Sequence, residues 1–202
     1  MNLLPRLSAA LLLVFCIIPG VVCAGEPPVP SAPTTAVGPT DAMPAPVADS
    51  DSTIVWKASE RLTWDDFRAR PTATDPLHAL TSSDLDVQIS CTDDHFRIAV
   101  QAVFRPLESW SKNRESERLL RHEQTHFDLT EVHARLLRQV LLRAHLTCEV
   151  ISTALKPLVD AEFKRWQNEQ DRYDRESDHG LDHKAQARWE AAVAERLAAL
   201  PE

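Results

Sequence analysis

The chain has 202 residues and a formal net charge of −8, and 44% of its residues are hydrophobic. This length allows one core-bearing domain together with a tail. The acidic balance argues against nucleic acid or an anionic lipid surface as the main partner.

The N-terminus has the pattern of a secretory signal peptide. Arg6 precedes an apolar run over residues 9–18, and Val22-Cys23-Ala24 offers small residues to a signal peptidase. We therefore expect residues 1–24 to be a signal peptide that is cleaved after Ala24. The apolar run is too short to cross a bilayer, which takes about 20 residues. An alternative is lipid attachment at Cys23, although the residues before it lack the usual leucine.

The next segment is rich in proline. Residues 25–51 contain seven of the fourteen prolines, separated mainly by small residues. Such a composition cannot bury enough apolar surface to offset its ordering entropy, so it predicts a disordered tether. The folded domain is expected over residues 52–202, in the periplasm or secreted, and no later segment resembles a membrane span.

The domain begins with strand patterns and continues with helical ones. A short β-rich stretch covers residues 53–56, and hydrophobic residues alternate over 85–90 and 96–104, with a hairpin loop at 91–94. Period-two alternation predicts strands, so this part should form a small antiparallel sheet. A turn leads into a brief helical segment at residues 62–67. Three helices are expected at residues 114–145, 153–172 and 182–200, and Pro157 either opens or kinks the second of them. The predicted fold class is α+β.

Two cysteines remain after signal removal. Cys91 and Cys148 form an even pair without the CxxC spacing of a zinc site. In an oxidising compartment such a pair is expected to form a structural disulfide.

The longest predicted helix carries the sequence His122-Glu123-Gln124-Thr125-His126. Residues four apart lie on one helix face, so the rings of His122 and His126 can converge on one metal ion. Glu123 points about 100° around the helix, where it can reach a metal-bound water without ligating the metal. This spacing is typical of zinc hydrolases, in which the glutamate is the general base. A solvated, histidine-rich helix face is the alternative reading.

A catalytic zinc site needs a third protein ligand and an open position. His133 shares the helix face but lies about 10 Å beyond His126 along the axis, so we exclude it. Glu131 points elsewhere and is better placed to pair with Arg135, four residues on, although it stays open as a ligand.

The predicted connection between the second and third helices offers better candidates. Residues 173–180 contain a histidine, several carboxylates and a tyrosine beside a glycine that permits a sharp turn. We expect His179 to be the third ligand, with Asp174 as the alternative, and either residue could instead anchor a ligand imidazole. Tyr173 could donate a hydrogen bond to the oxyanion of a tetrahedral intermediate. An ordinary polar turn is the alternative for this segment.

Several motifs together resemble a bacterial family described as predicted secreted zinc-dependent proteases, otherwise largely a domain of unknown function. The resemblance covers roughly residues 54–200 and is carried by Leu62-Thr63-Trp64-Asp65-Asp66-Phe67, Ser109-Trp110, the run from Leu119 to Arg135, Tyr173-Asp174, His179-Gly180, Gln186 and Trp189. It implies His122 and His126 as zinc ligands and Glu123 as the base. The family's activity rests on the same motif, so the resemblance says little about the substrate.

The leading hypothesis is therefore an exported zinc metallopeptidase acting on a peptide or protein, with Zn²⁺ as cofactor. One alternative is a metal-binding or protein-binding module of the periplasm without turnover. Another is a zinc amidase that acts on cell-wall material.

Overall fold

The computed structural model describes residues 53–93 and 95–201. The expected signal peptide and tether lie outside these described residues. Three strands form an antiparallel sheet in the order β1-β4-β3, and two short strands, β2 and β5, pair with each other. The strands are β1 (Ile54–Val55), β2 (Ala79–Leu80), β3 (Ser83–Thr92), β4 (His95–Phe104) and β5 (Trp110–Ser111), with a 3-10 turn η1 at Trp64–Asp66.

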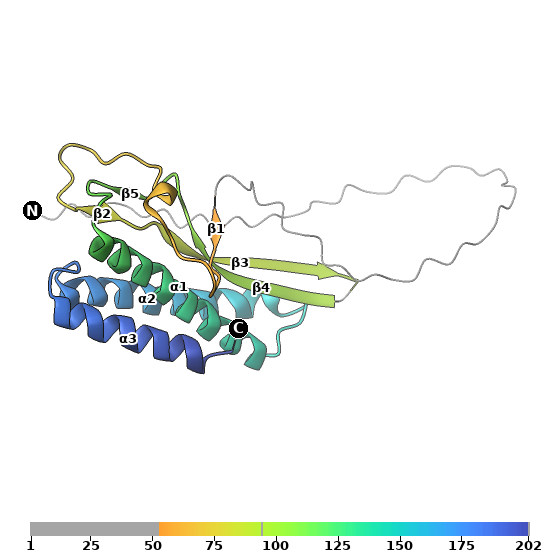
Figure 1. Cartoon of the computed structure of the whole chain (residues 1–202). Coiled ribbons are helices and arrows are strands. Elements are labelled where there is room, and N and C mark those ends of the chain that lie inside the picture. The colour runs from red at the N-terminus through yellow and green to blue at the C-terminus, as the bar shows by residue number, and fades with distance from the viewer. Residues whose placement is uncertain (1–52, 94, 202) are drawn as a thin grey trace, which may run out of the picture. The chain divides into compact units, whose positions relative to one another are not determined.

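Three helices follow the strands (Figure 1): α1 (Glu117–Arg143), α2 (Ile151–Ser177) and α3 (His183–Ala199). Small antiparallel sheets followed by helices confirm the expected α+β class. No helix of the described residues is long and apolar enough to cross a membrane.

The hairpin of β3 and β4 is longer than the hydrophobic alternation predicted. Pairing continues through Cys91 with Phe96 and Thr92 with His95, so Cys91 lies in a strand and not in a loop. Asp93 adopts a left-handed conformation with φ 50°, which Asp tolerates and tight hairpin turns require. Cys91 is disulfide-bonded to Cys148 with a Cα–Cα distance of 5.8 Å. The predicted disulfide is confirmed, and it ties the end of β3 to the segment between α1 and α2.

The second helix also differs from its predicted extent. Pro157 lies inside α2 and does not open it, and the helix continues to Ser177. Tyr173 and Asp174 therefore belong to the last turns of a helix and not to a connecting loop. The helix ends at Asp178, which has left-handed φ and ψ and whose backbone N–H bonds to the carbonyl of Asp174. Such an ending depends on one residue entering the left-handed region, which is hard to place from composition.

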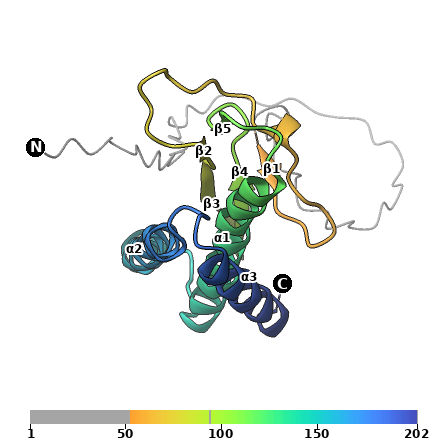
Figure 2. The ribbon, with the colours of Figure 1, turned by 60° about the vertical axis from the view of Figure 1, so that its left-hand side comes forward.

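Helix α1 runs between the sheet on one side and α2 and α3 on the other (Figure 2). Phe104 of the sheet contacts Phe127 of α1 and Phe67, with ring centroids 5.8 and 5.0 Å apart. On the opposite side, Leu129 and Val132 of α1 pack in a second apolar cluster with α2 and α3. A helix covered on both sides must bury polar side chains as well as apolar ones. Each of these then needs a partner.

The segment before η1 is attached to α1 through such buried polar groups. The Trp56 ring N–H donates to Asp128 Oδ1 at 2.8 Å, and Arg61 pairs with Asp128 Oδ2 at 2.6 Å. The side-chain oxygen of Gln124 accepts from the Leu62 backbone N–H at 2.7 Å. These bonds hold the middle of α1, and with it the histidine motif, in register against the chain that precedes it.

Candidate metal centre

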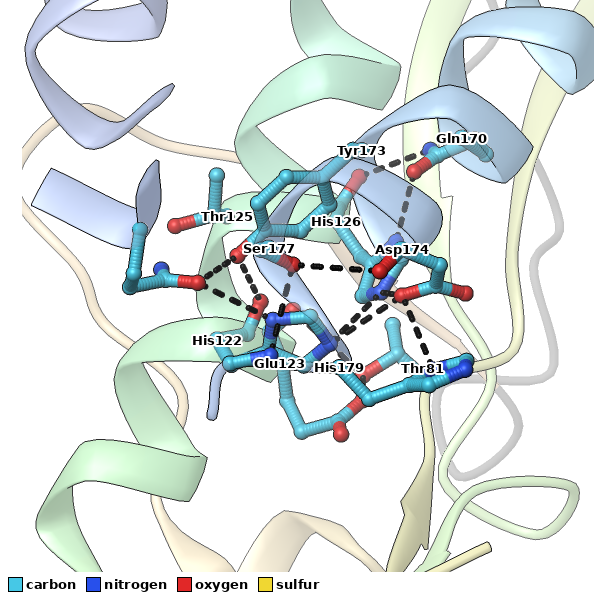
Figure 3. A network of polar contacts seen from close by, with 12 residues as sticks. Thr81, His122, Glu123, Thr125, His126, Gln170, Tyr173, Asp174, Ser177 and His179 are labelled. Carbon is cyan, nitrogen blue, oxygen red and sulfur yellow. Dashed lines mark hydrogen bonds and ion pairs between the residues drawn. The ribbon is translucent and has the colours of Figure 1, made fainter. Parts of the chain in front are cut away.

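The two histidines of α1 meet at their outer nitrogens (Figure 3). His122 Nε2 and His126 Nε2 are 3.2 Å apart, and the His122 side chain is 3% exposed. Nitrogen ligands lie about 2.0–2.1 Å from zinc, so two ligands of one tetrahedral ion are about 3.3 Å apart. The expected convergence of the two rings therefore occurs, at a separation that suits a shared ion.

Asp174 of α2 places a third donor atom at the same point. Its Oδ1 is 2.9 Å from His126 Nε2 and 3.1 Å from His122 Nε2. His179 lies further out, with Nδ1 3.5 Å from Asp174 Oδ1 and a side chain that is 55% exposed. Ligand atoms of His122, Asp174 and His179 all lie within 4.8 Å of one another. The two candidates for the third ligand thus lie at one site, and Asp174 is closest to both imidazoles of α1.

The inner nitrogens of both rings are bound by glutamine side chains. His122 Nδ1 lies 3.1 Å from Gln186 Oε1, and His126 Nδ1 lies 2.7 Å from Gln170 Oε1. The amide orientations follow from their other partners: Gln186 Nε2 donates to Glu190, and Gln170 Nε2 donates to the His126 carbonyl. Each amide oxygen therefore faces a ring nitrogen that must carry the hydrogen.

With hydrogens on both Nδ1 atoms, a neutral imidazole presents a bare lone pair at Nε2. Two such lone pairs and the Asp174 carboxylate then face one another within about 3 Å, an arrangement that repels unless a cation lies between them. A proton or a metal ion can supply that positive charge. Outer hydrogen bonds that fix the imidazole tautomer are a general feature of metal-ligating histidines. The donor set therefore fits a divalent metal.

The contact between the imidazoles and the Asp174 carboxylate shifts the pKa values of His126 and Asp174. Burial alone would lower the pKa of His126, but its hydrogen bond to Asp174 and the charge of that carboxylate raise it to about 9. Burial would raise the pKa of Asp174, yet the two imidazoles hold it well below its usual range. Both shifts favour a charged pair of His126 and Asp174 at this point.

Glu123 lies beside the imidazoles and is almost fully buried, with 3% exposure. Its Oε2 accepts a hydrogen bond of 2.7 Å from the Thr81 hydroxyl, just after β2. The Glu123 carboxylate does not join the groups that meet at the two Nε2 atoms. This agrees with the sequence, which places Glu123 about 100° around the helix from the histidines. Its charge nevertheless contributes to the raised pKa of His126.

Tyr173 lies behind the imidazoles. Its ring stacks on His122 with a centroid distance of 4.7 Å, and its hydroxyl donates to Gln186 Oε1 at 2.8 Å, with the His122 carbonyl at 3.2 Å. The side chain is fully buried, and burial raises the pKa of the hydroxyl. This hydroxyl is engaged inside the protein, and the ring supports that of His122. A hydrogen bond from Tyr173 to an oxyanion stays a prediction.

The turn after α2 brings the chain back against α1. Asp178, His179 and Gly180 have positive φ angles of 49°, 51° and 78°. A Cβ at Gly180 would lie 3.1 Å from His122 Cβ and Cγ. Both the φ angle and this close approach require glycine there.

Two other acidic or imidazole side chains of α1 lie outside the cluster. Glu131 accepts from Arg135 Nε at 2.8 Å, the predicted pair, so its carboxylate is engaged by a guanidinium. His133 is held between Glu162 and Glu169, at 2.6 and 2.8 Å from its two ring nitrogens. Neither residue is part of the candidate metal centre.

Thr81, Gln170 and the role of Gln186 were not predicted from the sequence. The sequence of α2 did contain a sign of these contacts. Residues on the face of a helix that packs against a core recur every three or four positions and are normally apolar. In α2 this spacing is occupied by Gln170, Tyr173, Asp174 and Ser177. A polar stripe in those positions indicates a buried polar partner. Thr81 lies between β2 and β3, far from Glu123 in the sequence, and no local pattern pointed to it.

The fold is α+β, and the ligand atoms of His122, Asp174 and His179 lie close enough together that they could hold a metal ion, with His126 Nε2 2.9 Å from Asp174 Oδ1. The family model described as "Bacterial protein of unknown function (DUF922)" matches residues 43–180. The chain belongs to this family. Neither a curated protein nor a solved structure matches the chain. The match includes His122, His126, Asp174 and His179, whereas Gln186 and α3 lie beyond it.

Proposed function

We propose that the chain is an exported zinc-dependent hydrolase that cleaves peptide bonds, with His122, His126 and Asp174 as metal ligands and Glu123 as general base. The observation that carries this proposal is the convergence of two Nε2 atoms and one carboxylate oxygen within 2.9–3.2 Å. The glutamines behind both imidazoles support it, because they leave both lone pairs directed at the same point.

In this proposal Asp174 is the third metal ligand, a role for which the sequence favoured His179. Its oxygen is in contact with both imidazoles, whereas His179 reaches only Asp174, at 3.5 Å. A catalytic site needs one position free for water or substrate. We therefore assign His179, which is exposed, to the open side of the site as a contact for substrate.

Bound zinc would supply Lewis acidity, which lowers the pKa of water to about 7 and polarises a carbonyl. Glu123 accepts the proton of the attacking water and then transfers it to the leaving amine. The hydrogen bond from Thr81 fixes the orientation of the Glu123 carboxylate. Tyr173 and Gly180 support the His122 ring from behind and from the side. Export is supported by the disulfide, since such bonds persist in oxidising compartments.

A closed, non-catalytic metal site is the second candidate, because one observation favours it. With His179 as a fourth ligand beside Asp174, the four donors would leave no open position for substrate. Such a site would stabilise the fold or deliver metal without turnover.

The test compares the chain from residue 25 with its Glu123→Gln variant and with Glu117→Gln, an exposed glutamate of α1. Zinc content is measured by elemental analysis, and turnover is measured on a proteome-derived peptide library with and without chelator. We expect about one zinc in all three proteins, and turnover in all but Glu123→Gln. Full turnover in Glu123→Gln, or wild-type protein without zinc, would refute the enzyme. Zinc without turnover in wild type would favour the closed site.

The ligand assignment has its own test. Asp174→Asn should weaken zinc binding far more than His179→Ala, because only Asp174 contacts both imidazoles. The reverse order of zinc dissociation constants would return His179 to the ligand set.

A further inference from the structure

A hollow of about 190 Å³ lies next to the metal cluster. His179 and Gly180 form one side of it, and both belong to the turn that packs against the cluster. Gly180 lies against the His122 ring, and His179 approaches Asp174. A substrate held at the cluster could therefore extend one group directly into this hollow.

The walls of the hollow combine apolar groups with groups that can donate hydrogen bonds. Leu119 and Leu181 are apolar, and Leu181 is 55% exposed although it is large. Arg118 and His78 add a guanidinium and an imidazole, and none of the described residues that line the hollow is acidic. This composition stands out because the chain has 30 acidic residues against 22 lysines and arginines.

Arg118 has the chemistry to bind an anion here. It lies in the first turn of α1, close to the cluster, and its guanidinium contacts the His183 ring of α3. A guanidinium binds carboxylates through paired hydrogen bonds, and a carboxylate prefers it to an ammonium for this reason. With a volume of about 190 Å³, the hollow has room for a side chain or a chain end.

We propose that this hollow is a substrate subsite for a carboxylate-bearing group adjacent to the bond that is cleaved, with Arg118 as the specificity-determining residue. The proposal rests on the proposed function of the neighbouring cluster. The carboxylate can come from an acidic side chain or from a free C-terminus. Both present the same group to Arg118, and the experiment separates them.

The test measures binding without turnover. Four small probes are titrated by calorimetry: N-acetyl-leucine and its amide, and N-acetyl-glutamate α-amide with its glutamine equivalent. Each pair differs only in the charged carboxylate. We expect at least one carboxylate probe to bind about tenfold more tightly than its neutral partner, equal to about 1.4 kcal/mol. Preference in the leucine pair identifies a C-terminus, and preference in the glutamate pair identifies an acidic side chain.

Two variants assign the preference to the hollow. Arg118→Gln should abolish it, whereas Arg143→Gln should leave it intact, since this matched change lies at the far, exposed end of α1. Equal binding of carboxylate and amide probes by the wild type would overturn the subsite, as would an unchanged preference in Arg118→Gln. Because the readout is binding and not cleavage, failure of the hydrolase proposal is recognised separately, by wild-type protein that keeps the carboxylate preference but shows no zinc-dependent turnover.

Discussion

The hydrogen bond between Gln170 and His126 makes a sharp prediction about metal binding. Gln170 Oε1 accepts from His126 Nδ1 at 2.7 Å, and its amide nitrogen donates to the His126 carbonyl at 2.9 Å. Gln170→Ala removes the acceptor, so the buried Nδ1–H loses its partner and the ring is free to change tautomer or rotate. The lone pair at Nε2 is then no longer fixed toward His122 and Asp174.

The expected effect on zinc follows from this loss. Outer-shell hydrogen bonds to ligating histidines typically contribute 10–100-fold to metal affinity. The zinc dissociation constant of Gln170→Ala should therefore rise by about 10–100-fold, equal to about 1.4–2.7 kcal/mol. Gln170→Glu keeps an acceptor at this position and should retain affinity, because a carboxylate increases the basicity of the imidazole.

The assay is a competition titration against a chromophoric zinc chelator, with circular dichroism to verify folding. Gln167→Ala is the matched control, since Gln167 is an exposed glutamine of the same helix. A folded Gln170→Ala variant that binds zinc within about twofold of the Gln167→Ala control would refute the argument that the inner hydrogen bond orients the ligand.

Three further predictions concern stability. Gly180→Ala should destabilise the fold by at least about 1–2 kcal/mol because of its left-handed φ, and it should weaken zinc binding because the new Cβ would lie 3.1 Å from His122. Calorimetric unfolding measures the first effect and zinc titration the second. An unchanged Tm would contradict the first. Burial alone would raise the pKa of Glu169, but hydrogen bonds from His133 and Arg196 lower this pKa from 4.5 to about 2. Ionised Glu169 therefore contributes about 3 kcal/mol to the free energy of unfolding. This contribution is present above pH 4.5 and is lost as the pH falls toward 2. Urea unfolding between pH 5 and pH 2 should show this acid loss in wild type and a flatter slope in Glu169→Gln, and equal slopes would refute the assignment. Replacing Cys91 and Cys148 together by serine should lower stability by about 4 kcal/mol, given a separation of 57 residues; urea midpoints that match the oxidised wild type would show that the disulfide contributes nothing.

Part of the site depends only on short-range geometry, so it could be predicted. His122 and His126 are four residues apart, and any α-helix brings such residues to one face. The Glu131–Arg135 pair follows from the same spacing. Period-two alternation likewise located β3 and β4, although the strands extend further than the alternation does.

The remaining residues of the site depend on packing between distant segments. Asp174 reaches both imidazoles of α1 because α2 continues to Ser177 and lies along α1, and neither fact follows from local composition. Thr81 reaches Glu123 from the segment between β2 and β3, and the Tyr173 hydroxyl bonds to Gln186 of α3.

The sequence by itself determined that His122 and His126 lie one helical turn apart on the same face, that a carboxylate stands between them in the chain, and that the fold is α+β, because these follow from periodicities of a few residues. Only the tertiary structure decided that Asp174, rather than His179, contacts both imidazoles and that two glutamines fix their tautomers. Those features require segments some 44–64 residues apart to pack together, and packing of that kind is set by the whole core rather than by any local pattern.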